Sequence, residues 1–156
     1  MNQSSPKIII IGAGAAGLFS AIQNKLNIPN AGVTIIEKSN TILNKVKISG
    51  GGRCNVTHAC FDPKELIDHY PRGKKELLSC FYRFQPQDTI KWFESEGVPL
   101  KIENDGRIFP KSNSSQSIID CLLNKAKSLA IKIQTKVQIQ DISQHQDGFK
   151  IKFKHQ

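Results

Sequence analysis

The sequence predicts an α/β fold built on a parallel sheet, and its amino-terminal part carries most of that prediction. The apolar run at residues 8–11 consists of four isoleucines, which is typical of a parallel strand buried on both faces. A G-x-G-x-x-G motif at 12–17 follows at once, ahead of an apolar pattern that predicts a helix over 15–27. A second apolar run, 33–36, ends at Glu37. This order indicates a Rossmann-like strand–helix–strand unit with a right-handed parallel crossover.

Each part of this unit has a physical role in holding a dinucleotide. Gly12 permits the tight turn, Gly14 lets the backbone approach a pyrophosphate, and Gly17 lets helix and strand pack closely. The helix offers free N–H groups and the positive end of its dipole to the phosphates. Glu37 is placed to accept hydrogen bonds from a ribose hydroxyl. A turn without a ligand is the alternative, but the complete context favours an adenine dinucleotide site. The motif by itself does not separate FAD from NAD.

The rest of the chain predicts further helices and hairpins. Pro29, Asn30 and Gly32 end the first helix, whose buried stripe we expect to be Ala15, Ala16, Leu18, Ala21, Ile22 and Leu26. Later helices are expected over 62–70 (with Asp62 as cap), 74–84, 86–96 and 114–129, a third parallel strand over 131–134, and hairpins over 100–109 and 137–153. The aromatic residues Phe81, Tyr82, Phe84, Trp92 and Phe93 recur at helical spacing, so we expect core packing and not a flavin cage.

The composition is that of one globular domain of 156 residues with a net charge of +9. No apolar run is long enough to span a bilayer and no leader pattern precedes the isoleucines, so we expect a soluble, cytoplasmic protein with no membrane partner. The positive charge raises a basic nucleic-acid-binding domain as a remote alternative. The lysines are scattered, however, and Lys150, Lys152 and Lys154 alternate with apolar residues as on a solvated strand face. We therefore expect no nucleic-acid partner.

The four cysteines do not indicate disulfides in a chain without a leader. Cys54 and Cys60 flank His58, but the spacing lacks paired C-x-x-C ligands, so no metal site is expected. Cys80 and Cys121 lie among apolar residues and are expected in the core.

A second glycine-rich segment, residues 45–55, is the other candidate for ligand binding. Three consecutive glycines are followed by Arg53, Cys54 and Asn55, which is unlike the Gly/Ser repeat of a flexible linker. We expect a loop that wraps a ligand, with a nest of backbone N–H groups facing an anion and with Arg53 pairing with phosphate.

The combination of GAGAAGL, Glu37 and KxxxSGGGRCNxT resembles the bacterial BaiN-like and aminoacetone oxidase-like FAD-binding flavoproteins, the HI0933-like family. The segment 106–112 is similar to that family's GRxFPxS. The chain departs from the family pattern at Leu43-Asn44, where Gly-Arg is usual, at His58 (usually Asn) and at Ser115 (usually Ala).

The resemblance implies an FAD/NAD(P)-binding Rossmann-like domain of the two-dinucleotide-binding type. It implies that the turn holds the pyrophosphate, that Glu37 with Lys38 beside it holds the adenosine ribose, and that Val137 lies near the adenine. Lys45 and the second glycine-rich segment would run along the cofactor toward the flavin. The implied FAD contacts are Gly12, Ala13, Gly14, Ala15, Ala16, Gly17, Glu37, Lys38, Lys45, Gly51, Gly52, Arg53, Cys54, Asn55 and Val137.

Family members carry an inserted domain and a carboxyl-terminal FAD segment, so we expect residues 1–156 to be the amino-terminal part of such a domain. The expected function is that of an FAD-dependent oxidoreductase, with NAD(P)H or a small molecule as its reaction partner. The alternative is a non-catalytic fragment that binds at most the ADP half of a dinucleotide. No catalytic residue can be assigned from the sequence. Cys54 is a candidate redox thiol beside Arg53, although a structural role is favoured.

Overall fold

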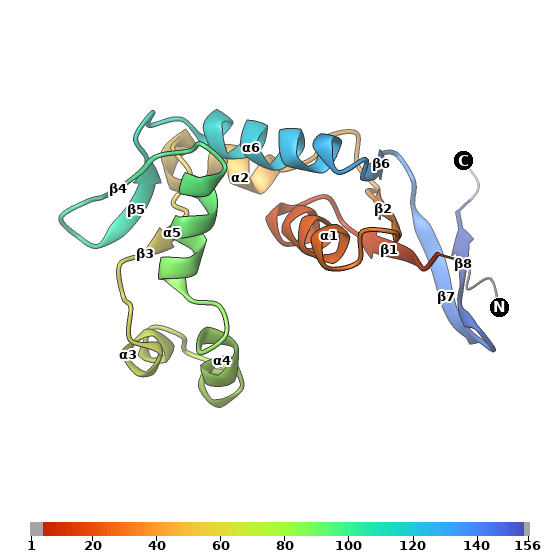
Figure 1. Ribbon diagram of the computed structural model, residues 1–156, viewed down its shortest axis with the longest axis horizontal. Coiled ribbons are helices and arrows are strands. Elements are labelled where there is room, and N and C mark those ends of the chain that lie inside the picture. Colours follow the sequence, from red (N-terminus) through yellow and green to blue (C-terminus); the bar gives the residue numbers. More distant parts are fainter. Residues whose placement is uncertain (1–4, 155–156) are drawn as a thin grey trace. The chain divides into compact units, whose positions relative to one another are not determined.

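The computed structural model describes residues 5–154 and divides into two compact units (Figure 1). The first unit comprises Met1–Lys45 and Leu122–Gln156, and the second comprises Val46–Cys121. Two helices, α2 (Asn44–Ile48) and α6 (Ser115–Ser128), contain the points at which the chain passes from one unit to the other. Each unit is described separately below.

The first unit contains a three-stranded parallel sheet with the strand order β1-β2-β6. Its strands are β1 (Lys7–Ile11), β2 (Gly32–Ile36) and β6 (Lys132–Gln134), and α1 (Ala15–Asn27) connects the first two. Figure 1 shows α1 lying beside β1 and β2. The predicted first helix, parallel pairing and third strand are confirmed, and the predicted second strand begins one residue earlier than expected.

One face of this sheet and one side of α1 form the core of the first unit. Leu18, Ala21 and Ile22 of α1 are fully buried, as are Val33 and Ile35 of β2. The predicted helix stripe is wrong at Ala15 and Ala16, which are exposed in the first turn, and at Leu26, which is 44% exposed near the other end.

The predicted burial of the isoleucine strand on both faces is also wrong. Ile9 is 41% and Ile11 58% exposed, because α1 packs against only one face of β1 and these two side chains project from the other. Side chains alternate between the two faces of a strand, so Ile8 and Ile10 are more buried than Ile9 and Ile11.

A separate antiparallel hairpin, β7 (Ile139–His145) and β8 (Gly148–Phe153), completes the first unit. The hairpin and its turn at Asp147-Gly148 are confirmed, although β7 begins after Val137. Its apolar residues are not buried as the alternation suggested: Phe149 is 74% exposed.

The second unit contains a small antiparallel sheet and three short helices. The sheet has the order β3-β5-β4, and the elements are β3 (Thr57–His58), β4 (Leu100–Ile102), β5 (Arg107–Pro110), α3 (Pro63–Asp68), α4 (Lys74–Phe81) and α5 (Pro86–Ser95). The predicted hairpin and helices are confirmed, and Asp62 caps α3 by accepting a hydrogen bond from the Lys64 N–H at 2.8 Å. The sequence did not predict α2 or β3, which are too short to show a period.

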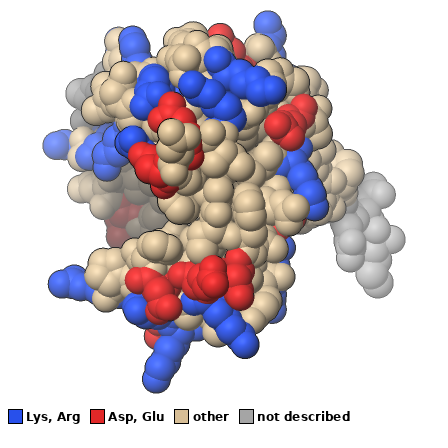
Figure 2. Space-filling view, turned by 90° about the vertical axis from the view of Figure 1, so that its left-hand side faces the viewer, with Lys and Arg blue, Asp and Glu red and all other residues tan. Residues whose placement is uncertain are grey.

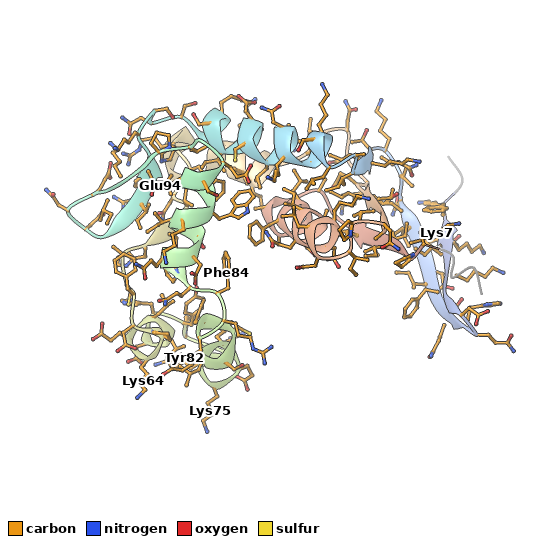
Figure 3. All side chains as sticks on the ribbon, in the orientation of Figure 1. Lys7, Lys64, Lys75, Tyr82, Phe84 and Glu94 are labelled. Carbon is orange, nitrogen blue, oxygen red and sulfur yellow. The ribbon has the colours of Figure 1, made fainter. Side chains whose placement is uncertain are left out.

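Several side chains of the second unit lie elsewhere than expected. Phe93 is buried, but Tyr82 is 60% and Phe84 42% exposed; both follow α4 and are labelled in Figure 3. Cys80 is exposed, whereas Cys121 is buried as expected. In residues 5–154 no three or more His, Cys, Asp or Glu residues are grouped in a way that could hold a metal ion. Nor is any helix within that range long and apolar enough to cross a membrane.

Candidate functional site

The structure constrains the three glycines of the first motif in different ways. Gly12 has φ +98°, a conformation that favours glycine, and its N–H donates to the Ile36 carbonyl at 2.8 Å. A Cβ on Gly17 would lie 1.9 Å from the Gly12 carbonyl oxygen, so close packing requires glycine there. Gly14 has an extended backbone, and a Cβ on it would meet no protein atom within 4 Å. The fold therefore requires glycine at positions 12 and 17. At position 14 the protein itself would tolerate a Cβ, which would project into space that a ligand could occupy.

The amino terminus of α1, next to Gly14, has the features of an anion site. The first intrahelical bond is donated by Leu18 to the Gly14 carbonyl at 3.0 Å. The N–H groups of Ala15, Ala16 and Gly17 have no acceptor within the described part of the chain, and the first turn has neither a side-chain cap nor an acidic residue. Unpaired N–H groups and the helix dipole together attract negative charge.

Glu37, which follows β2, fastens the glycine-rich turn to the sheet. Its Oε2 accepts a hydrogen bond from the Ala13 N–H at 2.9 Å, and its Oε1 accepts one from the Ser39 N–H at 2.8 Å. The bond from Ala13, followed by that from Ser39, lowers the pKa of the carboxyl group below its ordinary value. The Ala13 carbonyl in turn accepts from the Leu43 N–H at 2.9 Å. An ionised carboxylate therefore holds the turn and keeps lone pairs for a ligand.

A surface pocket of about 320 Å³ lies where β1 and β2 end. Its lining residues are Ile11, Gly12, Ile36, Glu37, Lys38, Val137, Gln138 and Ile139. Val137 is held there because its N–H donates to the Glu37 carbonyl at 3.0 Å. The pocket combines apolar walls with a carboxylate, and its volume is at the lower end of ligand pockets.

The pocket brings together four of the predicted cofactor residues, namely Gly12, Glu37, Lys38 and Val137. Lys45 is exposed on α2 and does not line it. The apolar walls of the pocket, Ile11, Ile36 and Ile139, were not among the predicted contacts. Ile11 and Ile36 could have been predicted, because each is the last residue of its strand and is followed directly by a predicted cofactor contact, Gly12 or Glu37.

Leu43, one of the departures from the family pattern, has an unusual backbone. It is 2% exposed and has φ +56°, a left-handed conformation that costs a leucine free energy. Glycine, which the resemblance leads us to expect at this position, adopts that conformation without a penalty.

The second glycine-rich segment closes on itself. Gly50, Gly51 and Gly52 have φ of +56°, +66° and +84° within the short 3₁₀ segment Ser49–Gly52. The Arg53 N–H donates to the Gly50 carbonyl at 3.4 Å, and the Cys54 N–H to the Ser49 carbonyl at 3.0 Å. The N–H groups of Arg53 and Cys54 are therefore used within the loop, and an anion-binding nest formed by the glycine N–H groups stays a prediction.

The side chains of Arg53 and Cys54 also have partners inside the second unit. The Arg53 Nη1 donates to Glu103 Oε1 at 2.6 Å, and the guanidinium lies 4.0 Å from the centre of the Phe109 ring. The expected pairing of Arg53 with phosphate stays a prediction. Cys54 is 6% exposed, and burial raises the pKa of its thiol, which favours a structural role over redox chemistry. Gly51 and Asn55 are exposed and Gly52 is half-buried.

Of the other two departures from the expected pattern, Ser115 has its hydroxyl paired, whereas the buried Nδ1 of His58 has no hydrogen-bond partner within residues 5–154. The buried Ser115 Oγ donates to the Lys47 carbonyl at 2.9 Å, so the added hydroxyl is paired. The His58 Nε2 lies 3.1 Å from the Asp105 carbonyl oxygen.

Comparison with protein-family models decides the affiliation. Residues 6–156 match the model described as the HI0933-like protein Rossmann domain. The chain belongs to this family. The expected resemblance and the Rossmann-like α/β fold are thereby confirmed.

Two bacterial enzymes are among the relatives of this chain. The chain is 30% identical over 146 residues to the 3-dehydro-bile acid delta(4,6)-reductase of Clostridium scindens, covering 94% of this chain and 35% of the reductase. It is 30% identical over 153 residues to the ribosomal RNA dihydrouridine synthase of Haemophilus influenzae, covering 98% and 36%. The chain thus spans about a third of the length of these relatives.

Solved structures share the fold at low sequence identity. A flavocytochrome c3 fumarate reductase in its open conformation matches with a TM-score of 0.63 and 18% identity, over 96% of this chain and 32% of the reductase chain. A 3-ketosteroid-delta4-(5alpha)-dehydrogenase from Rhodococcus jostii matches with a TM-score of 0.62 and 13% identity, over 91% and 40%.

Proposed function

We propose that the first unit binds the ADP half of FAD and that the protein is the FAD-binding part of a flavin-dependent oxidoreductase. The observation that carries the proposal is the pocket beside Gly12, where a carboxylate and apolar walls meet at the carboxyl ends of two parallel strands. Ligands of open α/β sheets bind at this edge.

The residues present fit an ADP group. The open space at Gly14 and the unpaired N–H groups of Ala15, Ala16 and Gly17 accommodate a pyrophosphate. The Glu37 carboxylate accepts hydrogen bonds from the ribose hydroxyls. The walls formed by Ile11, Ile36 and Ile139 would contact the adenine faces, with Val137 beside the ring.

The flavin, when bound, supplies the redox chemistry, and this chain's residues bind and orient it. Two bacterial relatives, a reductase and a dihydrouridine synthase, support an oxidoreductase reaction for the whole protein. We propose NAD(P)H or a small molecule as its partner. For Lys45, Gly51, Gly52, Arg53, Cys54 and Asn55, a position along the cofactor remains a proposal from the family resemblance.

A ligand series tests the proposal. The purified chain is titrated calorimetrically with FAD, ADP and FMN, which contain both halves, the adenosine half and the flavin half respectively. We expect FAD and ADP to bind with similar affinity and FMN not to bind. Binding of FMN with no binding of ADP would contradict the assignment of the pocket to adenosine.

The second candidate is a chain that binds the ADP half without catalysis. It is favoured by one observation: the predicted contacts that line one pocket, Gly12, Glu37, Lys38 and Val137, all belong to the adenosine side of the cofactor. Reduction of bound FAD by NADH or NADPH under anaerobic conditions, followed by its absorbance, separates the two candidates. A chain that binds FAD but allows no faster reduction than free FAD supports the non-catalytic candidate.

A further inference from the structure

A second pocket of the first unit lies at the opposite end of the parallel sheet from the proposed ADP site. It has a volume of about 240 Å³ and is lined by Lys7, Ile9, Lys25, Ala31, Gly32, Val33, Thr34, Ala130 and Lys132. Along β2, Gly32 in this pocket and Glu37 in the other are separated by roughly 16 Å at the usual rise of a strand. The proposed dinucleotide does not explain this pocket.

The sheet places two of the three lysines on one face. Ile9 pairs with Thr34, and Thr34 pairs with Lys132, so these three side chains project from the same side of the sheet. Lys7, labelled in Figure 3, precedes Ile9 by two residues on β1 and therefore shares that face. Lys7 and Lys132, one from each outer strand, thus line the pocket on the same face of the sheet.

The third lysine is fixed in place by the backbone. The Lys25 Nζ donates to the Pro29 carbonyl at 2.8 Å and to the Ala31 carbonyl at 2.7 Å. An ammonium group has three donors, so one N–H remains for a ligand. No acidic residue lines the pocket, and within residues 5–154 none of these three lysines has an acidic partner.

The two units also differ in charge. The first unit has eleven lysines against three acidic residues, Glu37, Asp141 and Asp147, for a net charge of +8. The second has eleven lysines and arginines against ten acidic residues, for a net charge of +1. The four ion pairs found in the described chain all lie in the second unit, and Figure 2 shows a face on which acidic and basic side chains are interspersed. Nearly all the excess charge therefore belongs to the unit that contains the lysine pocket.

We propose that the pocket formed by Lys7, Lys25 and Lys132 binds a phosphate group, carried by a free phosphorylated small molecule or by the backbone of RNA. Three lysines lining one pocket without an acidic residue give it a positive potential, and a bound phosphate would accept charge-assisted hydrogen bonds from them. The proposal does not depend on FAD binding, because the two pockets share no residue.

The test uses inorganic pyrophosphate and a short single-stranded oligouridylate as probes, titrated into the full chain at low and at moderate salt. The variant K7Q/K132Q removes two ammonium groups and leaves Lys25, which also binds backbone carbonyls, in place. We expect it to weaken pyrophosphate binding at least about tenfold, since two bonds between charged groups are lost.

Two matched variants make the result specific. K150Q/K152Q removes the same charge from β8 of the same unit and is expected to leave pyrophosphate binding unchanged. K7R/K132R keeps the charge and is expected to retain binding, and melting curves of all variants report folding. FAD affinity is expected to stay constant throughout, which separates this site from the proposed ADP site.

The two probes distinguish the sources of the phosphate. If both probes bind, and if RNA binding depends less steeply on salt in K7Q/K132Q than in the parent, the phosphate at this pocket belongs to an RNA backbone. Binding of pyrophosphate but not RNA assigns a small molecule. If pyrophosphate does not bind at low salt, or if K7Q/K132Q and K150Q/K152Q weaken it equally, no phosphate site exists at this pocket and the proposal is wrong.

Discussion

The two glycine-rich segments of this chain look alike in sequence but differ in what their backbones leave open. At the amino terminus of α1, three consecutive N–H groups have no acceptor among the described residues, and the space beside Gly14 contains no protein atom. In the Ser49–Gly52 segment, the following N–H groups donate to carbonyls of the same loop, and Arg53 is paired with Glu103. The first segment is prepared to receive an anion, whereas the second uses its glycines to fold on itself.

This difference shows that glycine content alone does not identify a ligand loop. A glycine is required by the fold when its φ is positive or when a Cβ would collide, and it is left for a ligand when neither holds. Gly17 and Gly50 belong to the first kind, and Gly14 to the second. The predictions that follow test this division.

The largest effect is expected for Gly17→Ala. Its Cβ would lie 1.9 Å from the Gly12 carbonyl oxygen, so helix and turn must separate. We expect a loss of about 3 kcal/mol of unfolding free energy. Urea unfolding followed by circular dichroism measures it. A loss below about 1 kcal/mol would show that the turn can relax.

In the second segment, Gly50→Ala is expected to be more harmful than Gly51→Ala. A Cβ on Gly50 would lie 2.8 Å from both the Asn55 nitrogen and the Phe109 ring, at φ +56°, whereas a Cβ on Gly51 would meet nothing within 4 Å. We expect losses of about 2 kcal/mol and about 1 kcal/mol respectively, from the same unfolding measurement. Equal losses would mean that the positive φ alone, and not a collision of the Cβ, determines the loss of stability at both positions.

Gly14→Ala is expected to weaken the binding of ADP and FAD without harming the fold. A Cβ there meets no protein atom but occupies the space proposed for the pyrophosphate. We expect affinity to fall about tenfold to a hundredfold, while stability stays within about 1 kcal/mol. Gly32→Ala is the matched control, because its Cβ is equally unobstructed and it does not line the ADP pocket. If Gly14→Ala left the affinity for ADP and FAD unchanged, the pyrophosphate could not lie beside this turn.

Glu37→Gln is expected to lower stability in a way that depends on pH. The pKa of Glu37 is lowered in the folded chain, so its ionised form stabilises the fold above the ordinary value of 4.5. This contribution is lost as the pH falls through the folded pKa. We expect a difference of about 1 kcal/mol between parent and variant at about pH 7, shrinking below pH 4.5. Unfolding free energies across this pH range measure it, and a difference independent of pH would contradict the role of the charge.

Arg53→Ala is expected to have the smallest effect. It removes the contact of the guanidinium with Phe109, worth about 0.5–1 kcal/mol, while Lys101 Nζ remains 3.5 Å from the Glu103 carboxylate. ADP affinity should not change. A large loss of ADP affinity in calorimetry would show that Arg53 reaches the phosphates after all.

The sequence was a good guide wherever a signal is local. Asp62 before Pro63 predicted the cap of α3, and the Asn104-Asp105-Gly106 turn predicted the β4–β5 hairpin, because each depends on neighbouring residues only. It failed where burial depends on distant partners. Ile9 and Phe149 are apolar and were expected in the core, but both side chains are exposed in the structure. No local pattern indicated that Arg53 pairs with Glu103, fifty residues away.

By itself, the sequence determined the family, the strand–helix–strand unit and the position of Glu37 after β2. These follow from periodicity, turn chemistry and spacing, which act along the chain. Only the tertiary structure decided which glycines are free for a ligand, that Val137 meets Glu37 at one pocket, and that lysines from three elements line another. The physical reason is that parallel pairing places residues side by side that the chain separates by roughly a hundred positions, and no local pattern encodes that proximity.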